Sequence, residues 1–100
     1  MQEFSIITGA AGLLGEQHAI ALAEAGFNII LTDIDKKNLN NIKNKLQKTF
    51  KKQKIISYPM DITNEKEIII MKNYFKFKKI KISVLVNNAA MNPKMKEISK

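Results

Sequence analysis

Three glycines in the segment Ile7–Gly15, ITGAAGLLG, constrain the fold more than any other feature of the chain. They follow an apolar run and precede a helical pattern, and glycine inside a regular element is destabilising by about 0.5–1 kcal/mol relative to alanine. We expect Gly9 to allow a tight turn, Gly12 to let a ligand approach the backbone, and Gly15 to let a helix pack against a sheet. The segment therefore predicts a strand-to-helix turn that binds a pyrophosphate at the helix N-terminus.

The regions on both sides of the glycines alternate between strand and helix patterns. Short apolar runs predict four strands, at residues 3–7, 28–32, 55–58 and 81–86. Helical spacing predicts three helices, from 13 to 25, from the cap Asp35 to about Lys52, and from the cap Thr63 or Asn64 to about Phe77. Strands separated by helices form a parallel sheet with right-handed crossovers. We therefore expect an α/β fold, a Rossmann-type sheet with strand order 3-2-1-4, and a ligand between the first and fourth strands.

An acidic residue, Asp33, ends the second predicted strand, eighteen residues after Gly15. In a dinucleotide-binding fold a carboxylate at that place accepts hydrogen bonds from the adenosine ribose hydroxyls and repels a 2′-phosphate. Lys36 and Lys37 partly compensate this repulsion, but no arginine is present to bind such a phosphate. The pattern predicts a site that prefers NAD and does not exclude NADP. The alternative role of Asp33, as a helix cap, is better served by Asp35.

The chain is strongly basic, because its 100 residues include 17 lysines and its net charge is +8. This excess of positive charge makes nucleic acid an alternative partner. However, the chain has no arginine, and its lysines spread along two helices, so we expect a solvated surface and no nucleic-acid partner. With no cysteine and only His18, we expect no disulfide and no metal site. No apolar run approaches the roughly 20 residues of a membrane span, so we expect neither a membrane partner nor a secretory signal, and a cytoplasmic location.

Polar motifs also follow the third and fourth predicted strands, and together with the glycines they resemble the short-chain dehydrogenase/reductase family. The resemblance spans nearly the whole chain and rests on TGAAGLLG at 8–15, Asp33, Asp61-Ile62 and NNAA at 87–90. It implies that Asp61 binds the adenine amino group, with the backbone of Ile62 beside it. It also implies that Asn88 and Ala89 line the adenosine ribose and help to fix the fourth strand to the first. The expected cofactor-binding residues are Gly9, Gly12, Leu13, Leu14, Gly15, Asp33, Asp61, Ile62, Asn88 and Ala89.

Two details depart from the family's commonest form. Gly12 comes one residue earlier than usual, as in the branch that modifies sugar nucleotides, and the last motif ends in Ala90 instead of glycine. The segments 12–15 and 87–94 are similar to oxidoreductases associated with bacterial surface-sugar synthesis, which we take as a subfamily hypothesis. Without the resemblance, Asp61 is equally compatible with a turn before a helix, and Asn87-Asn88 with a polar loop.

The resemblance implies an oxidoreductase that transfers hydride between a nicotinamide cofactor and an alcohol or carbonyl substrate. In this family, proton transfer depends on a serine and a Tyr-x-x-x-Lys pair beyond the asparagine motif. Tyr74 and Lys78 have that spacing but precede the motif, so we expect them to lie far from the carboxyl ends of the first and fourth strands. We expect residues 1–100 to be a single, partial dinucleotide-binding domain, truncated after the fourth strand, without catalytic residues and without dehydrogenase activity.

The predicted partners are a dinucleotide and, in the full-length parent, a small-molecule substrate and further copies of the chain. Two alternatives stay open. The chain is a non-catalytic nucleotide-binding module, or it is a basic nucleic-acid-binding protein. A Tyr-x-x-x-Lys pattern encoded further downstream favours the enzyme over the module, whereas salt-dependent retention on DNA at physiological ionic strength favours the nucleic-acid binder.

Overall fold

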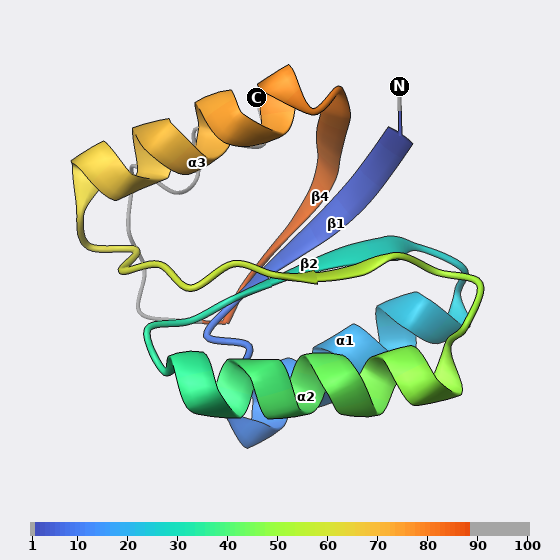
Figure 1. The fold of residues 1–100 in the computed structure, drawn as a ribbon. Coiled ribbons are helices and arrows are strands. Elements are labelled where there is room, and N and C mark those ends of the chain that lie inside the picture. The colour runs from blue at the N-terminus through green and yellow to red at the C-terminus, as the bar shows by residue number, and fades with distance from the viewer. Residues whose placement is uncertain (1, 89–100) are drawn as a thin grey trace.

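Four strands and three helices alternate along residues 2–88, which are the residues that this computed structural model describes (Figure 1). The elements are β1 (Gln2–Thr8), α1 (Leu13–Glu24), β2 (Asn28–Thr32), α2 (Lys36–Thr49), β3 (Ile55–Ser57), α3 (Glu65–Phe77) and β4 (Ile80–Asn87). The strands lie in the order β3-β2-β1-β4, and all three pairings are parallel. The predicted Rossmann-type sheet and its strand order are therefore confirmed.

The helices cover the two faces of the sheet unequally. α1 and α2 lie on one face, and α3 lies on the other (Figure 1). Right-handed crossovers explain this, because the chain reverses direction across the sheet between β3 and β4. Side chains of the central strands alternate between the two layers. Ile7, Ile29 and Leu31 pack in the layer of α1 and α2. Ile6 and Ile30 pack in the layer of α3, so the central strands are apolar along their length.

Turn and cap residues set the helix boundaries at the predicted places. Gly26 adopts a φ of 94°, which is favourable for glycine, and follows the end of α1. The Asp35 side chain accepts a hydrogen bond from the backbone N–H of Asn38 at 3.2 Å and caps α2. Asn64 caps α3 in the same way. Asp and Asn are unfavourable inside a helix and favourable at its start, which is why they mark the helix boundaries in the sequence.

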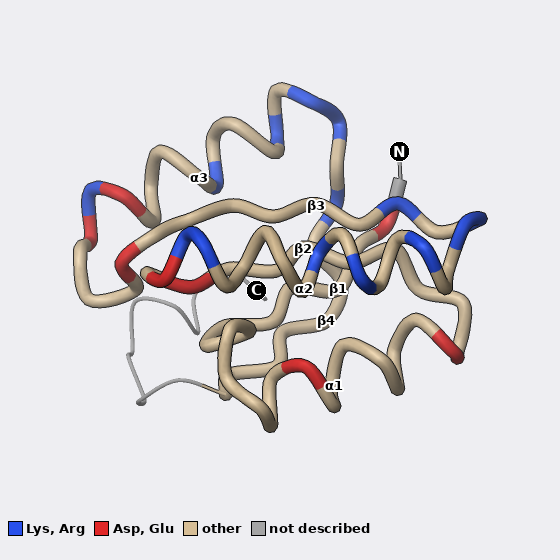
Figure 2. Tube along the Cα trace, turned by 60° about the horizontal axis from the view of Figure 1, so that its bottom comes forward, with Lys and Arg blue, Asp and Glu red and all other residues tan. Residues whose placement is uncertain are grey.

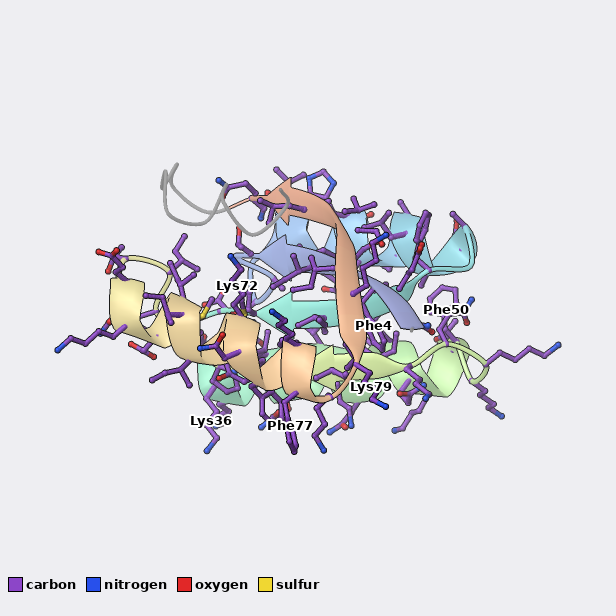
Figure 3. The ribbon with its side chains drawn as sticks, turned by 90° about the horizontal axis from the view of Figure 1, so that it is seen from above. Phe4, Lys36, Phe50, Lys72, Phe77 and Lys79 are labelled. Carbon is purple, nitrogen blue, oxygen red and sulfur yellow. The ribbon has the colours of Figure 1, made fainter. Side chains whose placement is uncertain are left out.

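Three elements end earlier than predicted, and α1 does so by a single residue, at Glu24. α2 ends at Thr49 because Phe50 leaves the helical conformation, with φ −110° and ψ 77°. The Phe50 side chain lies at this end of the helix (Figure 3), and it packs against the core between the sheet and the helices α1 and α2. β3 ends at Ser57, although the backbone N–H of Tyr58 still donates to Leu31 of β2 at 2.8 Å. The hydrophobic contact of Phe50 thus continues the predicted stripe beyond the helix itself.

Lysines gather along α2 and around the turn from α3 to β4 (Figure 2). On α2 they surround a buried stripe formed by Leu39, Ile42 and Leu46, as the sequence predicts. Lys45 of α2 forms an ion pair with Glu16 of α1 at 2.8 Å, which joins two helices on the same face. None of the helices in residues 2–88 has the length and apolar character needed to cross a membrane.

Candidate functional site

The turn between β1 and α1 contains the three glycines, and the fold itself requires two of them. Gly9 adopts a φ of 63°, in the left-handed region that glycine enters at little steric cost. Gly15 is buried in the first turn of α1. A Cβ at Gly15 would overlap the carbonyl oxygen of Gly9 and lie only 2.7 Å from the Cα of Ala10. Gly9 and Gly15 therefore let α1 start directly against the end of β1.

Gly12 has no such structural reason to be glycine. Its φ of −82° and ψ of 165° are extended values that any residue adopts. A Cβ at Gly12 would meet only the carbonyl oxygen of Gly9, at an ordinary contact distance of 3.5 Å. The residue is also exposed. Glycine at this position keeps the exposed surface of the turn free of a side chain.

The first turn of α1 presents backbone N–H groups without a side-chain cap. Gly12 is the N-cap residue and has no side chain to accept a hydrogen bond. The helix geometry leaves the N–H groups of Leu13, Leu14 and Gly15 without an intrahelical acceptor. Leu13 and Leu14 are 78% and 61% exposed, so their side chains do not cover this end. The positive end of the helix dipole is therefore open to an anion.

Asp33 lies directly beside the glycine turn and binds it. One oxygen of its carboxylate accepts a hydrogen bond from the backbone N–H of Ala11 at 3.0 Å, and the other accepts from the N–H of Asp35 at 2.9 Å. The side chain is only half-buried, so each oxygen keeps a lone pair for a further donor. Asp33 thus holds the turn in place and still presents a hydrogen-bond acceptor to a ligand.

Asn38 is a positioning residue that the sequence pattern did not reveal. Its side-chain amide donates to the carbonyl oxygen of Ala11 at 2.5 Å. Asp33 therefore binds the backbone N–H of Ala11, and Asn38 binds its carbonyl oxygen. The sequence places Asn38 among the lysines and asparagines of a solvated helix face, yet it is half-buried. Its place in the first turn of α2, at the edge where strands end, is the signal that could have identified it.

Asn88 connects the end of β4 to the glycine turn. Its backbone N–H donates to the Thr8 hydroxyl at 3.1 Å, and its side-chain amide donates to the Gly9 carbonyl at 3.3 Å. The Thr8 hydroxyl also lies 3.1 Å from the side-chain oxygen of Asn87. Hydrogen bonds therefore join β4 to β1 at the expected place, and Thr8 contributes to this junction. Ala89, the last predicted site residue, lies outside the described residues.

Asp61 and Ile62 lie on the loop after β3, which approaches Asp33. The backbone N–H of Met60 donates to the Asp33 carbonyl oxygen at 3.0 Å. A small pocket of about 160 Å³ brings together four of the predicted site residues with two apolar neighbours: Gly9, Asp33, Ile34, Met60, Asp61 and Ile62. Hydrogen bonds from the Thr63 hydroxyl and backbone N–H to the Asp61 carboxylate lower the pKa of Asp61. Asp61 is therefore ionised at neutral pH and ready to accept a hydrogen bond.

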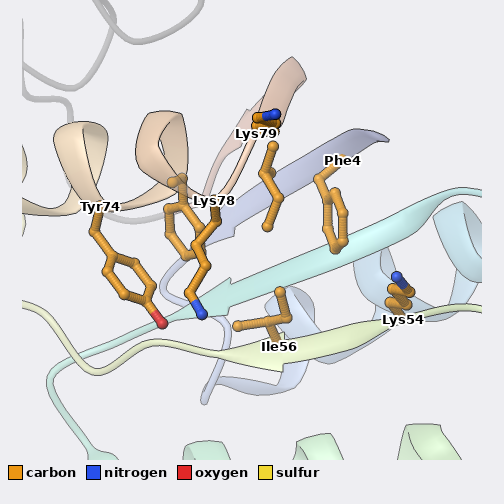
Figure 4. A pocket seen from close by; sticks show the side chains of 8 residues that line it. Phe4, Lys54, Ile56, Tyr74, Lys78 and Lys79 are labelled. Atoms are coloured by element: carbon orange, nitrogen blue, oxygen red, sulfur yellow. The ribbon is translucent and has the colours of Figure 1, made fainter. Parts of the chain in front are cut away.

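Tyr74 and Lys78 lie at the C-terminal end of α3, and the Tyr74 ring is 5.9 Å from the ring of Tyr58, which follows β3. With Phe4 and Ile80, near the starts of β1 and β4, the two residues line a common pocket (Figure 4). The Lys78 ammonium is 5.7 Å from the centre of the Tyr74 ring. The lining of this pocket contains no residue from the carboxyl end of β1 or β4, which is in line with the prediction for the pair.

Comparison with known proteins identifies the family from nearly the whole chain. The sequence model of the family described as short chain dehydrogenase matches residues 3–100. The chain is 35% identical over 94 residues to a diacetyl reductase, (S)-acetoin forming, of Staphylococcus epidermidis, across 92% of this chain and 35% of the relative. It is 32% identical over 85 residues to the 7alpha-hydroxysteroid dehydrogenase of Escherichia coli K12, across 85% of this chain and 32% of the relative. The chain thus spans about a third of the length of these curated relatives.

Solved structures agree with the sequence comparison. An NAD⁺-bound xylitol dehydrogenase superposes with a TM-score of 0.76 and 30% sequence identity. The superposition covers 90% of this chain and 34% of the xylitol dehydrogenase chain. The arrangement of four parallel strands and three helices is therefore shared with about a third of a larger chain.

Proposed function

The chain belongs to the short-chain dehydrogenase/reductase family, and on that premise we propose that residues 1–100 form the dinucleotide-binding part of an oxidoreductase. The proposed reaction transfers hydride between a nicotinamide cofactor and an alcohol or carbonyl substrate. The observation that carries the proposal is the start of α1, where an exposed glycine without a structural requirement meets uncapped N–H groups. The similar xylitol dehydrogenase, solved with NAD⁺, supports a nicotinamide dinucleotide as the ligand.

The residues of the turn fit a pyrophosphate. Gly12 leaves the surface of the turn free of a side chain, and the N–H groups of Leu13, Leu14 and Gly15 point along the helix axis toward an anion. Each such hydrogen bond to a charged oxygen is worth about 1.5–3 kcal/mol, more than one between neutral groups. When bound, the nicotinamide ring supplies the hydride donor or acceptor for the reaction. The residues of the turn hold and orient the cofactor and take no part in proton transfer.

We propose that Asp33 and Asp61 bind the adenosine half, and that Asp33 favours NAD over NADP. The Asp33 carboxylate accepts from the ribose hydroxyls and repels a phosphate at the same position. Lys36 and Lys37 are exposed at the start of α2 and reduce this preference without reversing it. Asp61 accepts from the adenine amino group beside the backbone of Ile62, and Asn88 lines the ribose together with Ala89. The similarity of segment 12–15 to surface-sugar oxidoreductases stays a subfamily prediction.

We propose that these 100 residues alone do not catalyse hydride transfer. Within residues 2–88, the tyrosine and lysine with the family's spacing line a pocket that contains none of the residues proposed to bind the dinucleotide. General acid–base catalysis needs its group within hydrogen-bond reach of the reacting atom. The alternative of a non-catalytic nucleotide-binding module makes the same prediction for this chain and differs only in what the parent protein does.

Calorimetric titration of the chain with NAD⁺ and NADP⁺ tests the proposal. NAD⁺ should bind at least about tenfold more tightly than NADP⁺, a difference of about 1.4 kcal/mol. The variant Asp33→Ala should bring the two affinities within about threefold. Asp35→Ala is the matched control, because it removes the same charge two residues away and should leave the ratio unchanged. Equal affinities in the unmodified chain contradict the preference, and salt-dependent binding of DNA without dinucleotide binding favours the nucleic-acid alternative.

A further inference from the structure

A pocket of about 650 Å³ opens at the edge of the sheet where the strands begin, and we call it the lysine pocket (Figure 4). Its lining combines apolar and aromatic side chains with three lysines: Phe4, Lys54, Ile56, Tyr74, Phe75, Lys78, Lys79 and Ile80. Pockets that hold small molecules have volumes of roughly 300–1,000 Å³. None of the residues proposed to bind the dinucleotide belongs to this lining. The lysine pocket is therefore large enough for a ligand of its own.

The inner wall of the lysine pocket is apolar and rich in aromatic side chains. Phe4 and Phe75 are 0% and 1% exposed, so packing fixes the positions of both rings. The Tyr74 ring lies 5.3 Å from the Phe75 ring in an edge-to-face arrangement and extends this wall outward. Ile56 and Ile80 are half-buried beside the rings. Rigid aromatic surface of this kind favours a ligand with a flat apolar body.

The lysines give the pocket an uncompensated positive charge. No acidic residue belongs to the lining. In the described part of the chain, the two ion pairs join other lysines, Lys45 and Lys81, to their carboxylates. The charges of the three lysines outweigh the partial negative charge of roughly −0.5 at the C-terminus of α3. The net charge of the lining therefore remains positive and favours an anionic group at the pocket entrance.

Backbone hydrogen bonds fix the attachment points of these lysines. Lys54 donates its N–H to the Asn28 side chain at 3.0 Å, and its carbonyl accepts from Ile29 at 2.9 Å. Lys78 donates its backbone N–H to the Tyr74 carbonyl at 3.1 Å. Lys79 has a φ of 59°, a left-handed conformation that glycine usually occupies at the end of a helix. A lysine at this position accepts backbone strain and adds a third cation at the pocket.

We propose that the lysine pocket binds an amphiphilic anion, a small molecule with a flat apolar body and one carboxylate or phosphate group. The apolar body lies against Ile56, Tyr74 and Ile80, which keep exposed surface, and the buried Phe4 and Phe75 support them from behind. The anionic group pairs with the Lys78 ammonium, which lies 5.7 Å from the centre of the Tyr74 ring, and Lys54 and Lys79 add positive charge from other sides of the pocket (Figure 4). This site is independent of the dinucleotide site, since the two share no residue.

Titrations of the chain with three matched probes test the charge requirement. 2-Naphthoate should bind at least about tenfold more tightly than the neutral 2-naphthamide, because each exposed ion pair contributes about two- to fivefold. Naphthyl phosphate identifies the preferred head group, and either anion binding above the amide supports the proposal. Equal binding of the amide and the carboxylate, or no binding of any probe at millimolar concentration, overturns it. This comparison needs no variant, so it does not depend on the folding of a mutant.

A triple variant tests the location. Replacing Lys54, Lys78 and Lys79 with glutamine should weaken 2-naphthoate binding at least about tenfold and leave the amide unchanged. The control replaces three exposed lysines outside the lining, Lys48, Lys66 and Lys72, and changes the net charge equally. Lys72 projects from a different side of α3 than Phe77 (Figure 3), and it does not belong to the lining of the lysine pocket. The control should lose less than about twofold. An equal loss in both variants shows general charge attraction and overturns the assigned site.

Discussion

The starts of α1 and α3 lie at the same edge of the sheet but satisfy their backbone groups in opposite ways. At α3, the Asn64 side chain accepts from the N–H groups of Lys66 and Glu67, at 3.0 and 3.2 Å. Glu65 and Glu67 place negative charge in the same first turn. At α1, the cap position is Gly12, and two exposed leucines follow it. One helix start is completed by its own side chains, and the other leaves donors open.

This difference separates stability from binding along one edge of the sheet. A helix start that is capped, as by Asn64, stabilises the fold by about 1 kcal/mol, and its N–H groups are already bonded and not available to an anion. An uncapped start gives up that stabilisation and keeps its N–H groups for a ligand. Asp33 and Asn38 compensate at α1 by holding the turn through Ala11 instead of through the helix N–H groups. Substitutions at the two starts should therefore have separable effects.

The largest expected effect is the loss of dinucleotide binding in Gly12→Val. A branched side chain on the exposed turn should block the pyrophosphate and weaken NADH binding at least about 100-fold, or about 2.7 kcal/mol. The free energy of unfolding should change by no more than about 1 kcal/mol, because the fold leaves space for a Cβ there. Calorimetric titration and thermal unfolding measure the two quantities. Unchanged NADH affinity would remove the main support for the proposed site.

The next effect should be destabilisation in Gly15→Ala. The added Cβ overlaps the backbone of Gly9 and Ala10, which is not free to move, so we expect a loss of about 1–3 kcal/mol in the free energy of unfolding. Gly26→Ala is the control, because it has open space around it and only the conformational cost of its φ of 94°. Denaturant titrations of both variants compare them. A smaller loss at Gly15 than at Gly26 would show that α1 can shift away from β1.

Periodicity and caps were enough to predict all seven elements and the strand order. β2 was predicted to the residue, because Gly26 precedes Asn28–Thr32 and Asp33 follows it. The glycines, Asp33 and Asp61 were predicted to share one edge, since parallel strands end at the same edge. The contact between Asn38 and Ala11 could not be predicted, because it depends on how closely α2 approaches a turn 27 residues away. The lysine pocket could not be predicted either, because Lys54 and Lys78 are distant in the sequence and line a common pocket only in the folded chain.

A smaller effect should follow from removing the cap of α3. Asn64→Ala leaves the N–H groups of Lys66 and Glu67 without their acceptor and should lower the free energy of unfolding by about 1 kcal/mol. NADH affinity should stay within about twofold of the unmodified chain. Asn73→Ala, an exposed asparagine inside the same helix, is the matched control and should not destabilise. If Asn64→Ala weakens NADH binding as strongly as Gly12→Val, the two helix starts are not separable.

The smallest expected effect is a change in pH dependence at the loop before α3. Hydrogen bonds from Thr63 lower the pKa of Asp61 below its ordinary value of 3.8 in the folded state. The ionised carboxylate therefore stabilises the fold above that ordinary pKa, and this contribution disappears as the pH falls through the lowered pKa.

Thr63→Val removes the hydroxyl donor at 2.6 Å, so the pKa of Asp61 should rise toward 3.8. The stability lost in Thr63→Val should accordingly be greater at neutral pH than at a pH below the lowered pKa of Asp61, where the carboxyl group is protonated in both states. Thr49→Val removes an exposed hydroxyl that donates to a backbone carbonyl, and its effect should not depend on pH. Carbon-detected NMR titration of the Asp61 carboxyl group measures the pKa directly, and an unchanged value in Thr63→Val would assign the shift to the backbone N–H alone.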